Sequence, residues 1–135
     1  MGLMIDTDVL IFFERHPDRF RQFLEGRQVE ELSISVITAS ELLHGVHRAG
    51  DSAIRARRET FVKAVLAQIF VIEIDLFIAR RHAQLWAELA RIGTMIGLHD
   101  SWIAATCLAH DLTLLTLNRH EFASVPELRM LSLET

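Results

Sequence analysis

A short apolar run near the N-terminus ends abruptly in two acidic residues. Leu3–Ile5 is followed by Asp6 and Asp8, and a helical pattern of apolar residues begins at Val9. A continuous apolar run of this length is typical of a buried strand in a parallel sheet. Ligands of open α/β sheets bind beyond the carboxyl ends of the strands. The sequence therefore predicts that Asp6 lies where a binding site is usual, and a half-sheltered carboxylate there needs a partner such as a divalent cation.

Further along the chain, short apolar runs alternate with patterns typical of helices. We expect strands at Leu3–Ile5, Leu32–Ile34, Ile69–Ile74, Leu112–Thr116 and Leu128–Leu131. We expect helices at Val9–Glu14, Pro17–Gly26, Val36–Arg48, Asp51–Gln68, Leu76–Ile92 and Asp100–His110, and a loop or single helical turn at Asn118–Phe122. This alternation predicts an α/β fold in which a small parallel sheet of about four to five strands has helices on both faces.

Length and composition restrict the class of protein. The 135 residues are enough for one domain, residues 1–135, but not for two. The chain is 50% apolar and 24% charged, which excludes a disordered chain. This apolar content is high for a small monomer, so we expect a second copy or another protein to cover part of the surface.

Several features favour a cytoplasmic protein. The richest apolar segment, Val62–Ala79, contains Lys63, Glu73 and Asp75, so we expect no membrane span. The N-terminal residues lack the basic region and long apolar core of a secretory signal. Cys107 is the only cysteine, which excludes an internal disulfide and suits the cytoplasm.

The acids differ in how well an ordinary structural role explains them. Asp6 can cap the helix that follows its strand, and Asp8 is an acid in the first turn that the helix dipole favours, which is enough to account for it. Asp100 falls between Ile103 and Ala104 on the apolar stripe of its helix. A dipole explains an acid in the first turn, but not a carboxylate at the top of a buried face.

Glu41 and Glu121 are ambiguous from local pattern alone. Thr38–Glu41 matches a capping box, but this explanation fails if Ser35 is the true N-cap, and Gly45 one turn later leaves room beside Glu41. Glu121 follows an expected strand, although in isolation a solvated loop residue is the better interpretation.

The remaining charged and aromatic positions have simple structural interpretations. The run Arg55–Glu59 lies on an expected helix and is interpreted as a solvated face. His99, beside Asp100, is interpreted as a loop residue, with a minor part in the site as the alternative. Trp86 and Trp102 have aliphatic neighbours at helical spacing and are expected in the core. The sequence contains no Cys and His set with the spacing of a zinc site.

Four motifs combine these residues in a characteristic order. They are Ile5–Leu10 (IDTDVL), Thr38–Gly45 (TASELLHG), Gly97–Thr106 (GLHDSWIAAT) and Leu114–Phe122 (LLTLNRHEF). Each motif alone is weak, but all of them in this order and at this spacing are specific. From Met4 to about Leu133, the sequence closely resembles the PIN-domain nucleases, and in particular the VapC-type toxins of bacterial toxin–antitoxin pairs.

The resemblance implies a PIN-like three-layer fold and RNA cleavage that depends on Mg²⁺ or Mn²⁺. Asp6, Glu41 and Asp100 match the three steadiest acids of the family. Family members carry a fourth acid at or near the position of Asn118, at that of Glu121, or at both; since Asn118 is an amide, Glu121 is the better candidate. The catalytic residues that the resemblance implies are Asp6, Glu41, Asp100 and Glu121, with Thr7, Thr116 and Asn118 as polar support.

The chemistry of Mg²⁺ indicates how these acids divide their roles. The ion prefers oxygen ligands and keeps several waters, so one or two direct carboxylates are enough. We expect Asp6 and Asp100 to bind it directly, and Glu41 and Glu121 to act through water or to hold a second ion. Four carboxylates repel one another without a cation, so metal is expected to raise stability.

The expected partners follow from charge, apolar content and resemblance. The net charge of −4 disfavours non-specific binding of nucleic acid, but bound cations would offset it in an acidic nuclease. Arg15, Arg19 and Arg27 flank the expected groove and are candidates for RNA contacts, although ordinary surface arginines are at least as good an interpretation. The resemblance implies an inhibiting VapB-type antitoxin, and a homodimer fits the high apolar content.

Two other classes of protein remain as alternatives. Phosphotransfer enzymes of the haloacid-dehalogenase type also carry two acids after a strand, like Asp6 and Asp8, but need a lysine near the phosphate. The only lysine, Lys63, lies mid-helix, which also weakens a receiver-domain interpretation. The second alternative is a non-catalytic PIN-like module that binds RNA or protein. Such modules usually lose acids, whereas Asp6, Glu41 and Asp100 are all present.

Overall fold

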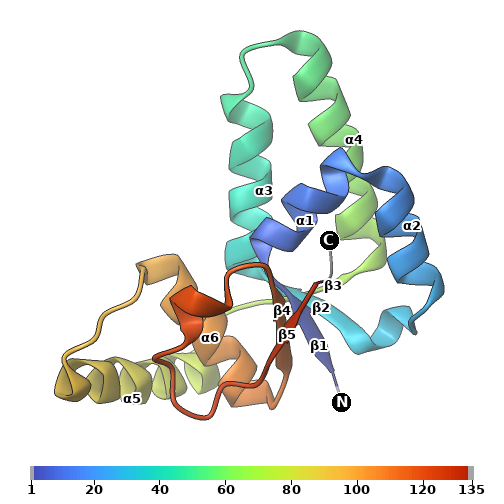
Figure 1. Cartoon of the computed structure of the whole chain (residues 1–135). Coiled ribbons are helices and arrows are strands. Elements are labelled where there is room, and N and C mark those ends of the chain that lie inside the picture. The colour runs from blue at the N-terminus through green and yellow to red at the C-terminus, as the bar shows by residue number, and fades with distance from the viewer. Residues whose placement is uncertain (1, 134–135) are drawn as a thin grey trace.

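A five-stranded parallel sheet forms the centre of the computed structural model, which describes residues 2–133 (Figure 1); the other positions of the expected 1–135 domain lie outside the described residues. The strand order is β3-β2-β1-β4-β5. The strands are β1 Leu3–Ile5, β2 Leu32–Ser35, β3 Phe70–Ile72, β4 Thr113–Thr116 and β5 Met130–Ser132. The helices are α1 Thr7–Arg15, α2 Pro17–Glu25, α3 Val36–Arg48, α4 Ser52–Gln68, α5 Leu76–Ile92 and α6 Leu98–His110, with short 3₁₀ helices η1 Val29–Glu31 and η2 Arg119–Phe122.

β1 is the central strand, and all of its side chains are buried. It pairs in parallel with β2 and β4, so that Ile5 lies opposite Leu115. Its side chains alternate between two cores: Leu3 and Ile5 pack with α1 to α4, and Met4 packs with α5 and α6. These two helical layers lie on opposite faces of the sheet (Figure 1). The predicted α/β fold with helices on both faces is therefore confirmed.

The helices α1 and α3 begin directly after their strands, at one edge of the sheet. Asp6 caps α1 through the Thr7 backbone N–H, and Ser35 caps α3 through the Ile37 N–H at 3.1 Å. Because Ser35 is the N-cap, the capping-box explanation of Glu41 is excluded. Both junctions bring polar side chains to the edge at which the carboxyl ends of β1, β2 and β4 meet.

Two helices begin earlier than the apolar pattern predicts. α1 begins at Thr7 rather than Val9, and α6 begins at Leu98 rather than Asp100. Periodicity marks only the apolar residues of a helix, so a polar first turn falls outside the pattern. As a result, Asp8 and Asp100 both lie inside a first helical turn.

The strands β3 and β5 differ most from the prediction, while β4 begins one residue later than expected, at Thr113. β5 covers Met130–Ser132 rather than Leu128–Leu131, because the chain turns at Glu127, whose φ of 66° is left-handed. β3 is restricted to Phe70–Ile72 instead of Ile69–Ile74, because β2 offers it only three paired positions. β3 and β5 are the edge strands of the sheet. Each pairs with a neighbour on one side only, so the local course of the chain determines its length.

The outer surface of α5 carries exposed apolar side chains that the sequence analysis did not predict. Trp86 is 60% exposed, so its assignment to the core is wrong. Trp102 is half-buried and stacks on His82 with ring centroids 3.6 Å apart. None of the helices between residues 2 and 133 combines the length and apolar character that a membrane crossing needs.

Candidate active site

Asp6 lies at the carboxyl end of β1, and both of its carboxylate oxygens accept hydrogen bonds. The Thr7 backbone N–H donates to Oδ1 at 2.9 Å, and the hydroxyl of Thr116, at the end of β4, donates to Oδ2 at 2.8 Å. The Asn118 backbone N–H donates in turn to Thr116 Oγ1 at 2.9 Å. Asp6 is only 5% exposed, so these contacts hold the carboxylate in one orientation. Asn118 thus contacts the site through its backbone N–H.

Glu41 joins this edge of the sheet from the second turn of α3. The Thr7 hydroxyl donates to Glu41 Oε1 at 2.6 Å and lies 3.0 Å from the Thr38 hydroxyl oxygen. His99 Nδ1 lies 3.3 Å from Glu41 Oε2. His99 belongs to the first turn of α6, so its interpretation as a loop residue is wrong. Glu41 therefore connects the starts of α1, α3 and α6.

Asp100 and Glu121 approach each other from α6 and η2. Burial raises the pKa of Asp100 to about 6, helped by a side-chain contact with Glu121 and by the charges of Glu121, Glu41 and Asp8. Glu121 on η2 therefore raises the pKa of Asp100 together with the acids on the helices α1 and α3.

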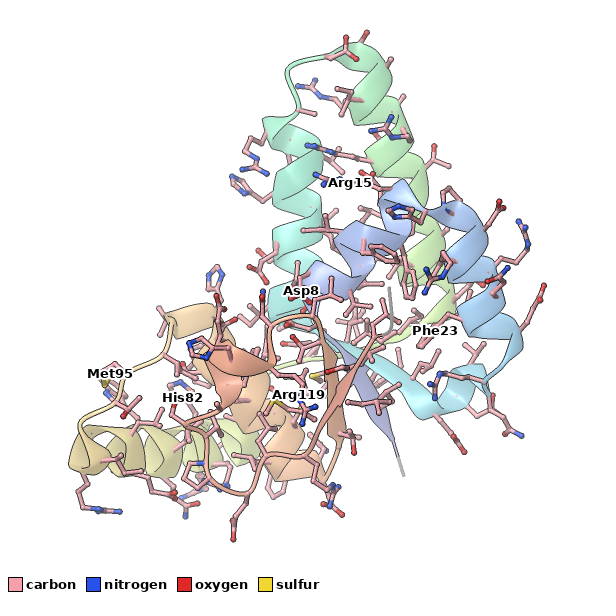
Figure 2. The ribbon with its side chains drawn as sticks, in the orientation of Figure 1. Asp8, Arg15, Phe23, His82, Met95 and Arg119 are labelled. Atoms are coloured by element: carbon pink, nitrogen blue, oxygen red, sulfur yellow. The ribbon has the colours of Figure 1, made fainter. Side chains whose placement is uncertain are left out.

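Asp8 is the acid whose surroundings the sequence interpretation missed. Figure 2 labels it at the start of α1, and its Oδ1 accepts the Leu117 backbone N–H at 3.3 Å. Its Oδ2 is buried, and within residues 2–133 it has no hydrogen-bond donor. Burial raises the pKa of Asp8, and the charge of Glu121 raises it further. The helix dipole alone does not account for a carboxylate in this position; the signal in the sequence was a second acid two residues after a strand-ending acid.

The cluster of acids is electrostatically strained as it stands. Burial and the Asp8 charge raise the pKa of Asp6 to about 7, although the bonds from Thr116 and Thr7 oppose this shift, and Asp100 adds to it. In the part of the chain that the structure describes, no three His, Cys, Asp or Glu side chains are already arranged to hold a metal ion. The available donors are carboxylate oxygens, and a cation among them would relieve both the repulsion and the unpaired Asp8 oxygen.

The arginines expected to contact RNA lie in different surroundings. Arg15 is at the end of α1 and lines a pocket that also includes Glu41 (Figure 2). The guanidinium of Arg19 lies 5.4 Å from the ring centroid of Phe12, and that of Arg27 lies 4.8 Å from the ring centroid of Phe23. Of these arginines, Arg15 is thus the one that shares a pocket wall with a predicted catalytic acid.

The family of the chain follows from comparison with known proteins. The family model described as "PIN domain" matches residues 3–128. The chain belongs to the PIN-domain family. This PIN domain is 30% identical to "Ribonuclease VapC" of Rickettsia bellii (strain RML369-C) over 98% of the chain and 96% of that protein. It is also 30% identical to the "tRNA(fMet)-specific endonuclease VapC" of Salmonella typhimurium over 96% of each sequence.

Solved structures agree with this assignment. DNA-bound VapBC from Salmonella typhimurium superposes with a TM-score of 0.88 at 28% identity and covers 98% of both chains. VapBC2 from Rickettsia felis, bound to a DNA fragment from its promoter, gives a TM-score of 0.87 at 25% identity and covers 99% of this chain and all of the other. Within the PIN-domain family, the chain is therefore a ribonuclease of the VapC type, as the sequence motifs predicted.

The phosphotransfer alternatives are excluded by this assignment, and the position of the lysine agrees. Lys63 lies on α4, its side chain is 76% exposed, and its amine lies 3.0 Å from Glu59 on the same helix. Lys63 therefore pairs with Glu59 on the protein surface and does not lie at the carboxyl edge of the sheet.

Replacing Thr116 with valine is expected to weaken cleavage about 10- to 100-fold, in the range found for groups that orient metal ligands. The substitution keeps the shape of the side chain but removes the O–H that bonds to Asp6 and the oxygen that accepts from Asn118. Without that bond the pKa of Asp6 rises further, so the pH profile of cleavage should shift to higher pH. Thr116→Ser keeps the hydroxyl and should stay close to the parent protein. An unchanged pH profile in Thr116→Val would contradict this role.

Proposed function

We propose that this chain is a Mg²⁺- or Mn²⁺-dependent ribonuclease toxin, located in the cytoplasm and inhibited by a cognate VapB-type antitoxin. The observation that supports this most strongly is the meeting of Asp6, Asp8 and Asp100 at the carboxyl edge of the sheet, each with a raised pKa. A protein gains little from holding several carboxylates in this state unless a cation binds there.

The donor set suits a hard cation. We assign Asp6 and Asp100 as direct ligands, because Asp6 is rigidly oriented and Asp100 shares its electrostatic environment. Glu41 and Glu121 are assigned to water-mediated binding or to a second ion, and Asp8 contributes its unpaired oxygen. When bound, the cation supplies positive charge that polarises the scissile phosphate and activates a water.

The protein side chains around these acids have positioning roles in hydrolysis. Thr116 and the Thr7 backbone fix the two oxygens of Asp6, while the Thr7 hydroxyl fixes one oxygen of Glu41. The charges of Glu121, Glu41 and Asp8 raise the pKa of Asp100, so a cation bound beside Asp100 would favour its charged form. Hydrolysis adds a water across one P–O bond of the RNA chain.

The same proposal includes protein partners. The solved relatives are VapBC complexes, which supports a VapB-type partner for this chain. Exposed apolar side chains on α5, on the loop after it and at the start of α6 support a further covered surface, which we assign to a homodimer. They are Leu76, Phe77, Trp86, Ile92, Met95 and Leu98.

The proposed activity is tested by incubating the purified chain with total RNA, with EDTA and with added Mg²⁺ or Mn²⁺. Cleavage is expected only with the metal, at discrete sites on an electrophoretic gel. Cleavage that is equally fast in EDTA would contradict the carboxylate site. If neither cleavage nor metal-dependent thermal stabilisation is observed, the chain acts as a non-catalytic binding module instead.

A further inference from the structure

A pocket of about 210 Å³ lies between α1, α3 and α4, beside the proposed active site. Glu41 forms part of its wall, so the pocket and the acidic cluster share a residue. Its charged lining consists of Glu14, Glu41, Arg15, Arg48, Arg57 and Arg58. The sequence interpretation of Arg55–Glu59 as a solvated face is thus wrong for Arg58, whose side chain is 29% exposed and donates to the Gly45 carbonyl at 2.9 Å.

The arginines of this pocket outnumber the acids that pair with them. Glu14, whose side chain is 11% exposed, lies 3.5 Å from Arg58 Nε and 3.8 Å from Arg57 Nε. Arg15 and Arg48 form no ion pair or hydrogen bond with any residue from 2 to 133. One buried carboxylate therefore positions two guanidinium groups, while two more remain available to an anionic ligand.

The size and position of the pocket indicate which anion it suits. Sites for whole small molecules usually exceed about 300 Å³, so a pocket of about 210 Å³ fits a single group such as phosphate. Arginine is well matched to phosphate, because its planar fork donates two parallel hydrogen bonds. We propose that this pocket binds a phosphate of the RNA strand adjacent to the bond that is cleaved. This inference rests on the proposed ribonuclease function.

Gly45 provides an independent indication that the space is a binding pocket. It lies in the interior of α3, where glycine lowers helix stability relative to alanine, and a Cβ placed on it meets no atom within 4 Å. Neither a tight turn nor close packing requires glycine here. Glycine therefore leaves the pocket wall without a side chain at this position of α3, between Glu41 and Arg48 in the sequence.

The first test measures RNA binding to Asp100→Asn, in which cleavage is expected to be lost. The probe is a fluorescein-labelled, single-stranded RNA of mixed sequence, titrated at several salt concentrations. Adding Arg15→Gln and Arg48→Gln should weaken binding about tenfold and reduce the slope of log K against log salt by about 0.7 for each phosphate that is no longer neutralised. The matched control, Arg80→Gln with Arg91→Gln on exposed positions of α5, should change binding less than twofold.

The second test fills the pocket without removing charge. Gly45→Leu should weaken RNA binding while the Tm stays equal or rises, because leucine favours the helix and a Cβ at this position meets no atom within 4 Å. Gly45→Ala should raise the Tm and weaken binding less than Gly45→Leu does, because its side chain fills less of the pocket.

The outcomes separate this inference from the proposed function. If the parent chain cleaves RNA but the arginine and leucine variants bind and cleave like their controls, the pocket assignment is overturned and the ribonuclease function stands. If the parent chain never cleaves RNA, the proposed function itself fails. If RNA binding is unchanged but binding of a glutamate-rich peptide is lost in Gly45→Leu, the pocket accepts an acidic protein segment, and the phosphate assignment is wrong.

Discussion

Asp100→Asn is expected to lower the rate of RNA cleavage by at least about 1,000-fold. Asparagine keeps the size and polarity of the side chain, but it lacks the negative charge that holds a cation. A bound cation supplies several kcal/mol of transition-state stabilisation, and each 1.4 kcal/mol corresponds to about tenfold in rate. The measurement is kcat/KM on total RNA in Mg²⁺. The thermal stabilisation by Mg²⁺ should also fall in this variant.

Asp111→Asn is the matched control for this substitution. Asp111 lies at the other end of α6, its side chain is 77% exposed, and its φ of 56° is tolerated by asparagine. The carboxylate bonds only to Arg129, at 2.8 Å to Oδ1, among the contacts that the described residues make with its side chain. We expect activity within about twofold of the parent protein. Cleavage by Asp100→Asn above one-tenth of the parent rate would show that this acid is not a metal ligand.

Much of the fold was predictable because its signals are local. The apolar run before Asp6, the cap Ser35 and the apolar stripes of the helices each depend on a few neighbouring residues, and the structure has all of them. The order of the motifs then identified the family. Local patterns do not encode which face of a helix is covered by another element. For this reason the prediction that Trp86 lies in the core is wrong, because its side chain faces outward.

The candidate site was predictable only in part, because its contacts join distant positions. Asp8 accepts from the backbone of Leu117, 109 residues later, and Glu41 accepts from Thr7, 34 residues earlier. Local pattern assigned Asp8 to the helix dipole and left Glu41 undecided. Arg58 likewise looked like a solvated helix residue until α4 was placed beside Gly45 of α3. Each of these environments exists only once the sheet order and helix layers are known.

The metal-free protein is expected to lose stability as the pH rises from about 4 to 7. The pKa of Asp6 is raised from 3.8 to about 7, and that of Asp100 to about 6. Between the unfolded and folded pKa values the native state binds more protons than the unfolded chain, so the free energy of unfolding falls with increasing pH. For the buried Asp6 this amounts to at most about 4 kcal/mol across the window, at 1.36 kcal/mol for each pKa unit.

The measurement that checks this is urea unfolding in EDTA at pH 5, 6, 7 and 8, repeated with Mg²⁺. His82, whose pKa is lowered by burial, contributes in the opposite direction, since its stabilisation grows as the pH rises through its unfolded pKa. Comparison with Asp6→Asn separates the two, because asparagine still caps α1 but does not titrate. In Asp6→Asn, most of the decrease in the free energy of unfolding with rising pH should be absent. Saturating Mg²⁺ should restore the stability of the parent protein above pH 7. Parallel pH curves for the parent and the variant would contradict the raised pKa of Asp6, and with it the argument that this acid cluster requires a cation.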